Sequence, residues 1–189
     1  MTTLDPATTA LVLIDLQEGI VGMDGLAPRS GPEVAEIARN LAARFREARA
    51  PVVLVHVGFR EGEAPPSAVD KPMQLPAGGT PPAWSQFVDR LQESRDIVVL
   101  KHHWGAFTGT DLDLQLRRRG VRTVVIAGIA TNMGVESTAR SAWEHSYDVV
   151  LVEDACTGRS AEMHAFAVAN IFPMIARVTS ADAVNLAVE

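Results

Sequence analysis

Short runs of apolar, largely β-branched residues recur along the chain, and stretches whose apolar positions follow helical spacing separate them. Strands are predicted at 9–14, 52–57, 96–101, 122–127, 148–153 and 176–179. Helices are predicted at 32–49, 111–119, 132–145 and 161–172, with a short one after 179. Strands that are apolar nearly throughout are buried on both faces. The pattern therefore predicts an α/β fold, a three-layer αβα sandwich with a mostly parallel, Rossmann-like sheet.

The length of 189 residues suits one domain, which we expect to span 1–189. Two segments break the alternation of strands and helices: a short irregular loop at 23–30, and a long segment at 60–82 that is rich in proline and glycine. A compact domain rarely carries a structureless loop of this length unless the loop is functional or disordered. We therefore favour a lid or an inter-subunit arm for 60–82 over a tolerated surface insertion.

Net charge and hydropathy narrow the range of partners. The formal net charge is −6, so no basic field is available to hold nucleic acid or an anionic membrane. The longest apolar runs fall far short of the roughly 20 residues that span a bilayer. The N-terminus has neither the basic nor the apolar region of a signal peptide, and one cysteine cannot form an internal disulfide. We expect a cytoplasmic homo-oligomer, a dimer or higher, that binds a small-molecule substrate.

Three polar or glycine-containing positions follow predicted strands directly. Asp15 comes after 9–14, Lys101 ends 96–101, and the turn 130–134 follows 122–127. In a parallel sheet, sites form in the crevice beyond the carboxyl ends of the strands. Burial at the rim of the core raises the pKa of Asp15, and a nearby ammonium group lowers it, which is typical of acid/base pairs. A structural ion pair, with Asp15 capping the next turn, remains open from these residues alone.

The run from Gly128 to Arg140, Gly-Ile-Ala-Thr-Asn-Met-Gly-Val-Glu-Ser-Thr-Ala-Arg, is the most specific motif of the chain. Together with Asp15 in Leu-Ile-Asp-Leu-Gln and Lys101 in Val-Val-Leu-Lys, it resembles the isochorismatase-like (cysteine) hydrolase family over essentially the whole chain. Most of that family carries a nucleophilic cysteine at the position of Gly134, so the resemblance implies a subgroup with glycine in its place. It also implies a cis peptide between Ile129 and Ala130 that aims backbone N–H groups at a developing oxyanion.

Gly134 admits two interpretations. It allows the following helix to pack closely on the sheet, or it marks a deleted nucleophile whose absence opens space for a water or a bulky substrate. The resemblance favours the second, because isochorismatases proper also lack the thiol and are thought to use the aspartate as a general acid.

Three hypotheses of function follow. The first is a thiol-independent hydrolase with Asp15, Lys101 and Gly134 as its catalytic positions. In it, Asp15 is the general acid/base, Lys101 sets its charge state, and the 130–134 amides hold negative charge. The second is a catalytically inactive, small-molecule-binding pseudoenzyme. The third is an amidase whose cysteine was replaced by Gly134.

Six residues are candidates for substrate binding: Gln17, Phe59, Trp104, Phe107, Ala130 and Thr131. Family members often use aromatic residues after the strand ending at Lys101 to sandwich a planar substrate, although core aromatics that anchor a loop would give the same pattern. The metal-binding Asp-x-His pair of the family's nicotinamidases is missing after Val57, where the chain reads Gly-Phe-Arg-Glu-Gly. We therefore expect no metal and no cofactor.

Other polar residues receive structural interpretations. Cys156 is expected to be a small buried hydrophobic residue rather than a substitute nucleophile. His164 is expected to be structural, and the basic run Arg117–Arg119 is expected to be a solvated helix end rather than an interface.

Overall fold

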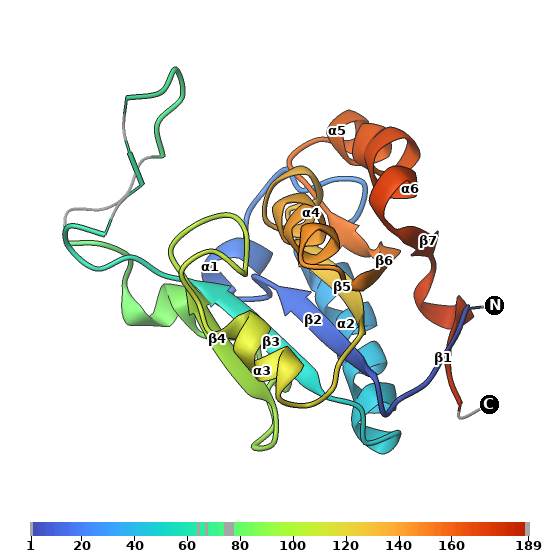
Figure 1. Ribbon diagram of the computed structural model, residues 1–189. Helices are drawn as coiled ribbons and strands as arrows, with labels where there is room; N and C mark the ends of the chain where they lie inside the picture. The colour runs from blue at the N-terminus through green and yellow to red at the C-terminus, as the bar shows by residue number, and fades with distance from the viewer. Residues whose placement is uncertain (1, 64, 67, 74–77, 188–189) are drawn as a thin grey trace.

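A six-stranded parallel sheet forms the centre of the protein, as a computed structural model shows for residues 2–63, 65–66, 68–73 and 78–187. Its strands are β2 (Thr9–Ile14), β3 (Val52–Val57), β4 (Ile97–Lys101), β5 (Thr123–Ile129), β6 (Asp148–Thr157) and β7 (Arg177–Thr179). They lie in the order β4-β3-β2-β5-β6-β7, and every neighbouring pair is parallel (Figure 1). The apolar runs of the sequence become strands because a sheet covered on both faces buries every second side chain on each side.

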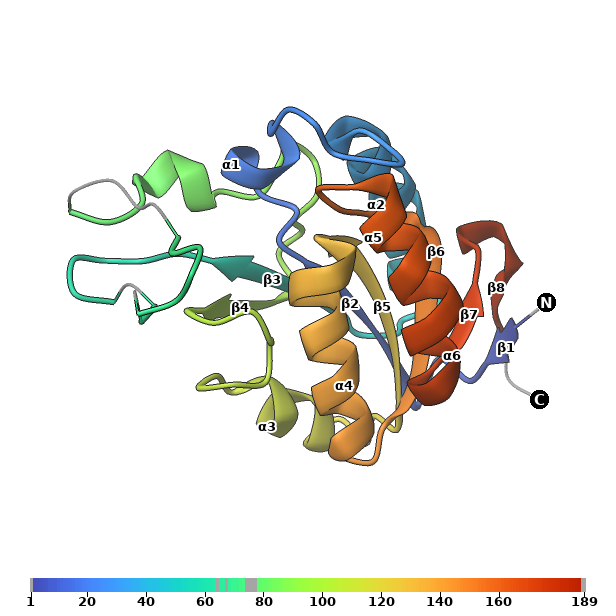
Figure 2. The ribbon, with the colours of Figure 1, turned by 90° about the horizontal axis from the view of Figure 1, so that it is seen from above.

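Helices cover both faces of this sheet. The long helix α2 (Gly31–Glu47) lies on one face, with the short α1 (Glu18–Val21) near its start. The opposite face carries α3 (Leu112–Arg117), α4 (Glu136–Glu144), α5 (Ala161–Phe166) and α6 (Phe172–Ile175) (Figure 2). A π-helical turn over Thr131–Val135 leads into α4, and another over Ala167–Ile171 joins α5 to α6. The predicted three-layer αβα fold with a parallel sheet is confirmed.

Local sequence signals explain the longest helix. Ser30 caps α2 by accepting a hydrogen bond from the Glu33 amide, and the Glu33 side chain accepts one from the Ser30 amide in return. This capping box satisfies two backbone donors that a helix start otherwise leaves unpaired. Val34, Leu41 and Phe45 then place a buried stripe along the helix face that meets the sheet.

A second, two-stranded sheet lies apart from the first and was not predicted. In it β1 (Thr2–Leu4) pairs in parallel with β8 (Val184–Leu186), which brings the two ends of the described chain together. Three residues are too few to show a two-residue hydrophobic period, so neither strand left a signal in the sequence.

The segment 60–82 leaves the body of the molecule as an arm, visible at the upper left of Figure 1. Its neck is closed by three hydrogen bonds between Phe59 and Thr80, of 2.8, 3.0 and 3.3 Å, next to a bridge between Arg60 and Gly79. Positions 64, 67 and 74–77 lie outside the described residues. The lid or inter-subunit role of this arm, like the homo-oligomer, stays a prediction. No helix of the described chain has both the length and the apolar character that a membrane crossing requires.

Candidate active site

The order in which strands are added to the sheet reverses at β2. From β2 the chain builds β3 and β4 on one side, and β5 is later added on the other side. Such a reversal of strand order is where ligands bind in open α/β sheets. Gly128 lets the two strand ends approach, because a Cβ atom there would lie 2.1 Å from the Ile14 carbonyl oxygen and its φ is +127°. The residues that follow β2 and β5 therefore face one another.

Asp15 lies at the end of β2 in a left-handed backbone conformation, with φ of +54°. Aspartate is one of the few residues other than glycine that tolerate this region. Its amide donates to the Val55 carbonyl at 2.8 Å, which ties the turn to the neighbouring strand β3. The residue is only 5% exposed. The turn thus holds the Asp15 carboxylate in a buried position at the carboxyl end of β2.

Lys101 reaches this carboxylate from the far side of β3. Strands β2 and β4 are two strand spacings apart, about 10 Å, and the long lysine side chain spans that gap. Its Nζ atom donates to Asp15 Oδ2 at 2.8 Å and to the His103 carbonyl at 3.0 Å. Lys101 is 2% exposed, so the ion pair is shielded from solvent. The expected proximity of Asp15 and Lys101 is present.

Opposed influences set the charge of Asp15. Loss of hydration raises its pKa to about 6, and the charge and hydrogen bond of Lys101 limit that rise. Its second carboxylate oxygen, Oδ1, is buried and accepts no hydrogen bond from the described residues. The carboxyl group therefore titrates near neutral pH and has one oxygen to offer to a hydrogen-bond donor.

Gly134 lies directly against this ion pair. A Cβ atom built on it would stand 3.2 Å from Asp15 Oδ2, 3.1 Å from Ile14 Cγ2 and 3.4 Å from the Trp104 carbonyl oxygen. The first two separations are tighter than ordinary contacts, so a side chain here would require Asp15 and Ile14 to shift by a few tenths of an ångström. The interpretation that Gly134 opens space is wrong for this structure. The glycine instead allows close packing against the Asp15 carboxylate.

The turn after β5 lies against Asp15 at Gly134. The expected cis peptide between Ile129 and Ala130 is present. The amides of Met133 and Val135 both donate to the Ala130 carbonyl, at 3.0 and 3.2 Å, and close the first turn of the helix. The backbone amides of Thr131 and Asn132 have no hydrogen-bond acceptor among the described residues. Free amides at a helix start favour an anion or a developing oxyanion.

The structure gives Gln17 and Thr131 side-chain partners within the protein. The Gln17 amide nitrogen donates to the carbonyls of Val57 and Trp84, and its oxygen accepts from the Val57 amide. The Thr131 hydroxyl lies 2.8 Å from His164 Nδ1 and is fully buried. Gln17 is thus a brace between segments, and Thr131 can offer a ligand its backbone amide rather than its hydroxyl. Substrate binding by either residue stays a prediction.

The three aromatic candidates are placed differently. Phe59 is buried after β3, where its backbone holds the neck of the arm. The Trp104 backbone borders Gly134, and its indole is 51% exposed at the surface. Phe107 instead stacks on His145, with ring centroids 5.2 Å apart, beyond the far end of α4 from Gly134. The structure therefore does not bring Phe107 to the crevice, because the loop after Lys101 runs down along α4.

That course of the loop is fixed by Thr138, a residue that sequence reasoning missed. Its hydroxyl donates to the Gly134 carbonyl at 2.6 Å and accepts from the Ala106 amide at 3.1 Å. The loop is thereby attached to the helix one turn after Gly134. A lone threonine inside a predicted helix gives no signal of this bridging role.

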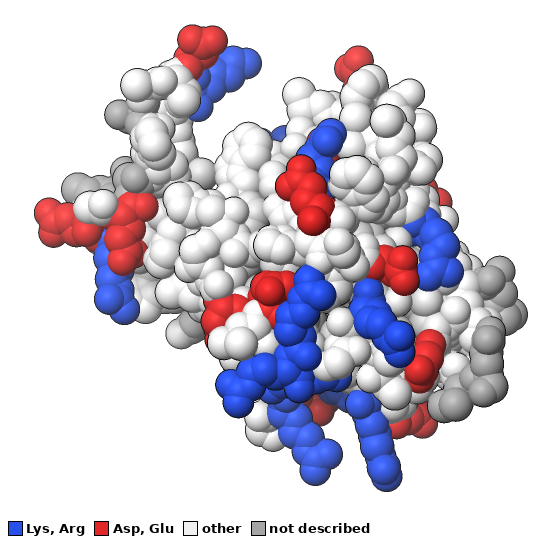
Figure 3. All heavy atoms as spheres, viewed as in Figure 1, with Lys and Arg blue, Asp and Glu red and all other residues white. Residues whose placement is uncertain are grey.

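Cys156 and the basic run take the structural places expected for them. Cys156 is fully buried in β6, and desolvation raises the pKa of its thiol to about 12. Arg117 pairs with Asp113 and lies 4.5 Å above the Tyr147 ring. On the face shown in Figure 3, basic side chains gather in the lower part, below α3. Among the described residues, no group of three or more His, Cys, Asp or Glu side chains is arranged to hold a metal ion.

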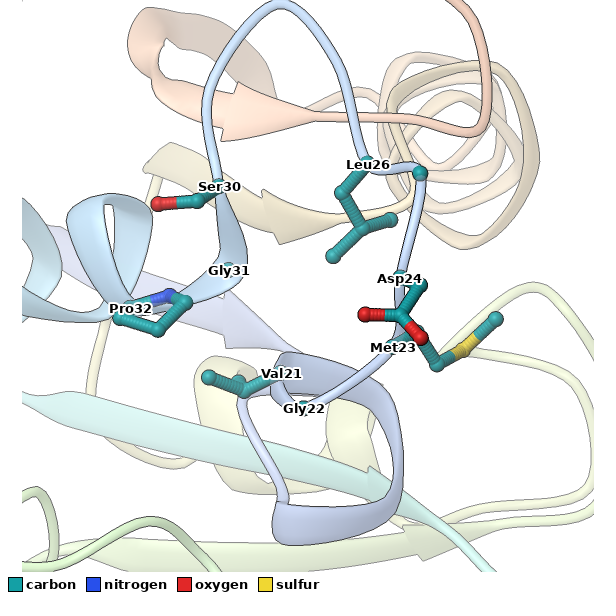
Figure 4. A pocket seen from close by; sticks show the side chains of 9 residues that line it. Val21, Gly22, Met23, Asp24, Leu26, Ser30, Gly31 and Pro32 are labelled. Atoms are coloured by element: carbon teal, nitrogen blue, oxygen red, sulfur yellow. The ribbon is translucent and has the colours of Figure 1, made fainter.

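Two surface hollows lie away from the ion pair. One, of about 290 Å³, is bounded by the loop after α1 and the start of α2, from Val21 to Pro32 (Figure 4). The other, of about 520 Å³, lies along the β4 edge between His56 and Val98. Neither hollow is lined by Asp15, Lys101 or Gly134.

Comparison with protein families shows which family the chain resembles. The model described as the Isochorismatase domain matches residues 9–183. An uncharacterized isochorismatase family protein of Escherichia coli O157:H7, YecD, is 49% identical over 185 residues, which cover 96% of this chain and 97% of that protein. The ureidoacrylate amidohydrolase RutB of Methylobacterium radiotolerans is 35% identical over 196 residues, which cover 89% of this chain and 74% of that protein.

A solved structure resembles the whole fold. It is an isochorismatase family protein from Burkholderia thailandensis, with a TM-score of 0.91 and 46% sequence identity. The match covers 97% of this chain and 96% of that one.

Proposed function

The chain belongs to the isochorismatase family, and we propose that it is a hydrolase of a small-molecule metabolite that works without a thiol. Asp15 acts on water, Lys101 sets the charge of Asp15, and the amides of the β5–α4 turn hold developing negative charge. The observation that carries the proposal is the buried Asp15 carboxylate, which keeps one oxygen on Lys101 and the other free of protein donors.

The charge state of Asp15 favours the role of general base. With a pKa of about 6, about a tenth of the carboxyl groups remain protonated at pH 7. The ionised form accepts a proton from water, whose oxygen attacks the electrophilic carbon of a C–N bond. The proton then passes from Asp15 to the leaving nitrogen as the C–N bond breaks, so Asp15 returns to its ionised form.

The free amides of Thr131 and Asn132 complement that step. Attack of water on a carbonyl carbon places a negative charge on the carbonyl oxygen, and preorganised N–H donors at a helix start stabilise it. The subgroup with glycine in place of cysteine is part of the proposal. Close packing at Gly134 supports it, since a cysteine would have to displace Asp15 or Ile14.

A vinyl-ether hydrolase is the alternative chemistry for the same residues. There the protonated Asp15 gives its proton to the vinyl carbon, water adds to the resulting cation and returns a proton to Asp15, and the adduct splits into a carbonyl compound and an alcohol. This route needs the minor, protonated form of Asp15 at pH 7. The amide route is preferred for that reason, and the amidohydrolase name of the relative RutB agrees with it.

The test is a screen of amides, ureido acids and vinyl ethers, read by product formation and by ligand-induced shifts in melting temperature. Wild-type protein is compared with Asp15→Asn, whose amide side chain keeps the size of the carboxyl group and tolerates the left-handed backbone. A loss of about 10²-fold or more in Asp15→Asn supports the proposal.

The remaining outcomes assign the protein to the other hypotheses. Binding without turnover by wild-type protein would overturn the hydrolase in favour of a small-molecule-binding pseudoenzyme. Amidase activity that appears only in Gly134→Cys would identify an amidase that lost its nucleophile. Once a substrate is found, the pH dependence of kcat/KM distinguishes the two chemistries. As pH increases through 6, kcat/KM rises if Asp15 is a general base and falls if it is a general acid.

A further inference from the structure

The hydrogen bond between Thr131 and His164 holds the β5–α4 turn on the side opposite Asp15. Strand β5 has β2 on one side and β6 on the other, and His164 lies on α5, which follows β6. The Thr131 hydroxyl and His164 Nδ1 are 2.8 Å apart. Thr131 is fully buried and His164 is 9% exposed. A polar pair at this depth is held firmly, because breaking it leaves two buried groups without partners.

Other contacts of the same region stabilise the turn from this side. The Asn132 side-chain nitrogen lies 3.5 Å from Met163 Sδ, beside His164 on α5. The Asn132 oxygen would be 3.3 Å from a Cβ atom on Gly158, so the loop before α5 also packs closely against the turn. The turn is therefore held between Asp15 at Gly134 and the start of α5 at Thr131.

Thr131 connects this support to the donors of the site. Its hydroxyl is bound to His164, and its backbone amide is one of the two in the turn that donate to no described residue. Both groups belong to one residue, so a backbone movement that redirected the Thr131 amide would also pull its hydroxyl away from His164.

We propose that His164 is a positioning residue that, through the Thr131 hydroxyl, fixes the direction of the backbone N–H donors of the β5–α4 turn. The inference rests on the proposed function, in which those donors hold negative charge. His164 touches neither substrate nor reacting atoms in this scheme.

The surroundings keep the imidazole neutral. Burial lowers the pKa of His164, Glu153 on β6 raises it, and Arg29 in the loop before α2 lowers it. A neutral ring with its proton on Nε2 accepts a hydrogen bond from the Thr131 hydroxyl at Nδ1. The hydroxyl is then hydrogen-bonded to His164, so the turn offers a ligand its backbone amides rather than this hydroxyl.

The test uses amide hydrogen exchange by NMR, which needs no substrate. The Met133 and Val135 amides close the turn on the Ala130 carbonyl, so their exchange reports opening of the turn. In His164→Leu we expect exchange about tenfold faster at these two amides and no change at Val125 in β5. His164→Asn places a polar atom where Nδ1 was and should return exchange to within about threefold of wild type. His145→Leu, at the other end of α4, is the matched histidine control.

Substitution of the other partner, Thr131, tests whether the effect comes from the lost hydrogen bond or from a folding defect of the His164 variant. Thr131→Val keeps the volume of the side chain and removes the hydroxyl, and it should reproduce the effect of His164→Leu, whereas Thr131→Ser should not. Unchanged exchange in both His164→Leu and Thr131→Val would overturn the proposal.

Kinetics on a substrate from the screen complete the test. We expect His164→Leu to lower kcat by about tenfold with KM nearly unchanged, and His164→Asn to recover most of it. Faster exchange with an unchanged kcat would overturn the positioning role. Failure of the proposed function is read separately, from full activity in Asp15→Asn or from no turnover by wild type, and the exchange data still decide whether His164 holds the turn.

Discussion

Gly134 and Asp15 approach so closely that a Cβ atom on the glycine would stand 3.2 Å from the Asp15 Oδ2 oxygen. The same oxygen accepts the 2.8 Å hydrogen bond from Lys101. A side chain at position 134 would therefore meet the carboxylate of the ion pair directly. In the proposed mechanism the nucleophile is water, and Asp15 Oδ1, which accepts no hydrogen bond from the described residues, is the atom that activates it.

The first prediction concerns this contact. Gly134→Ala forces Ile14 and Asp15 to move, and overpacking of this kind costs about 1–3 kcal/mol, against which the higher helix propensity of alanine returns about 1 kcal/mol. We expect a lower free energy of unfolding, measured by urea denaturation. Gly105→Ala is the matched control, because its nearest contact would be an ordinary 3.6 Å. Equal stability of the two variants would show that the site yields freely to a side chain.

The second prediction is a pH dependence of stability. Because burial raises the pKa of Asp15 from 3.8 to about 6, the folded state binds this proton more tightly than the unfolded state. The stability that Asp15 contributes is therefore complete below pH 3.8 and is lost as pH rises through 6. The loss corresponds to about 3 kcal/mol. The unfolding free energies of wild type and Asp15→Asn are measured by urea denaturation from pH 4 to 7, and their difference gives the loss. A difference that does not change with pH would contradict the raised pKa.

The third prediction concerns Lys101, whose positive charge holds the pKa of Asp15 down. Lys101→Met keeps the length of the side chain and removes the charge, so the pKa of Asp15 should rise further. In the pH profile of kcat/KM, the rise that accompanies ionisation of Asp15 (the rising limb) should then move to higher pH, and activity at pH 7 should be lower. The chain's other lysine, Lys71, is exposed in the arm and gives the matched control Lys71→Met. A limb that stays in place would mean that another group titrates.

The sequence predicted the strands better than the connections. Apolar runs define β2 and β3 to the residue, because burial on both faces makes all but Thr9 and His56 apolar. Strand β6 runs past the predicted end at 153 to Thr157, since after a shift of register Cys156 and Thr157 still pair with the end of β5. The predicted helix at 161–172 is interrupted by a π-helical turn, an extra residue that a regular helical period does not reveal.

In the candidate site too, residues at strand ends could be predicted from the sequence, and residues placed by loop contacts could not. Asp15 and Lys101 could be placed together from the sequence because parallel strand ends share one edge. Phe107 could not be placed, because the course of its loop depends on the Thr138 hydroxyl. The close packing at Gly134 was also hidden, since it arises from side chains and backbone of three distant segments.

The last prediction separates the two candidate reactive groups, Asp15 and Cys156. Cys156 is fully buried and desolvation raises the pKa of its thiol to about 12, so at neutral pH it is neither ionised nor accessible. Iodoacetamide should leave the folded protein unmodified and react once it is unfolded. Cys156→Ala should lose about 1 kcal/mol of stability through a small cavity, yet keep its activity per folded molecule.

Asp15→Asn should behave in the opposite way, because it keeps the fold and loses turnover by about 10²-fold or more. Both variants are measured at equal concentrations of folded protein, checked by circular dichroism. An inactive but folded Cys156→Ala beside an active Asp15→Asn would refute the thiol-independent mechanism, because the nucleophile would then belong to β6 rather than to water activated after β2.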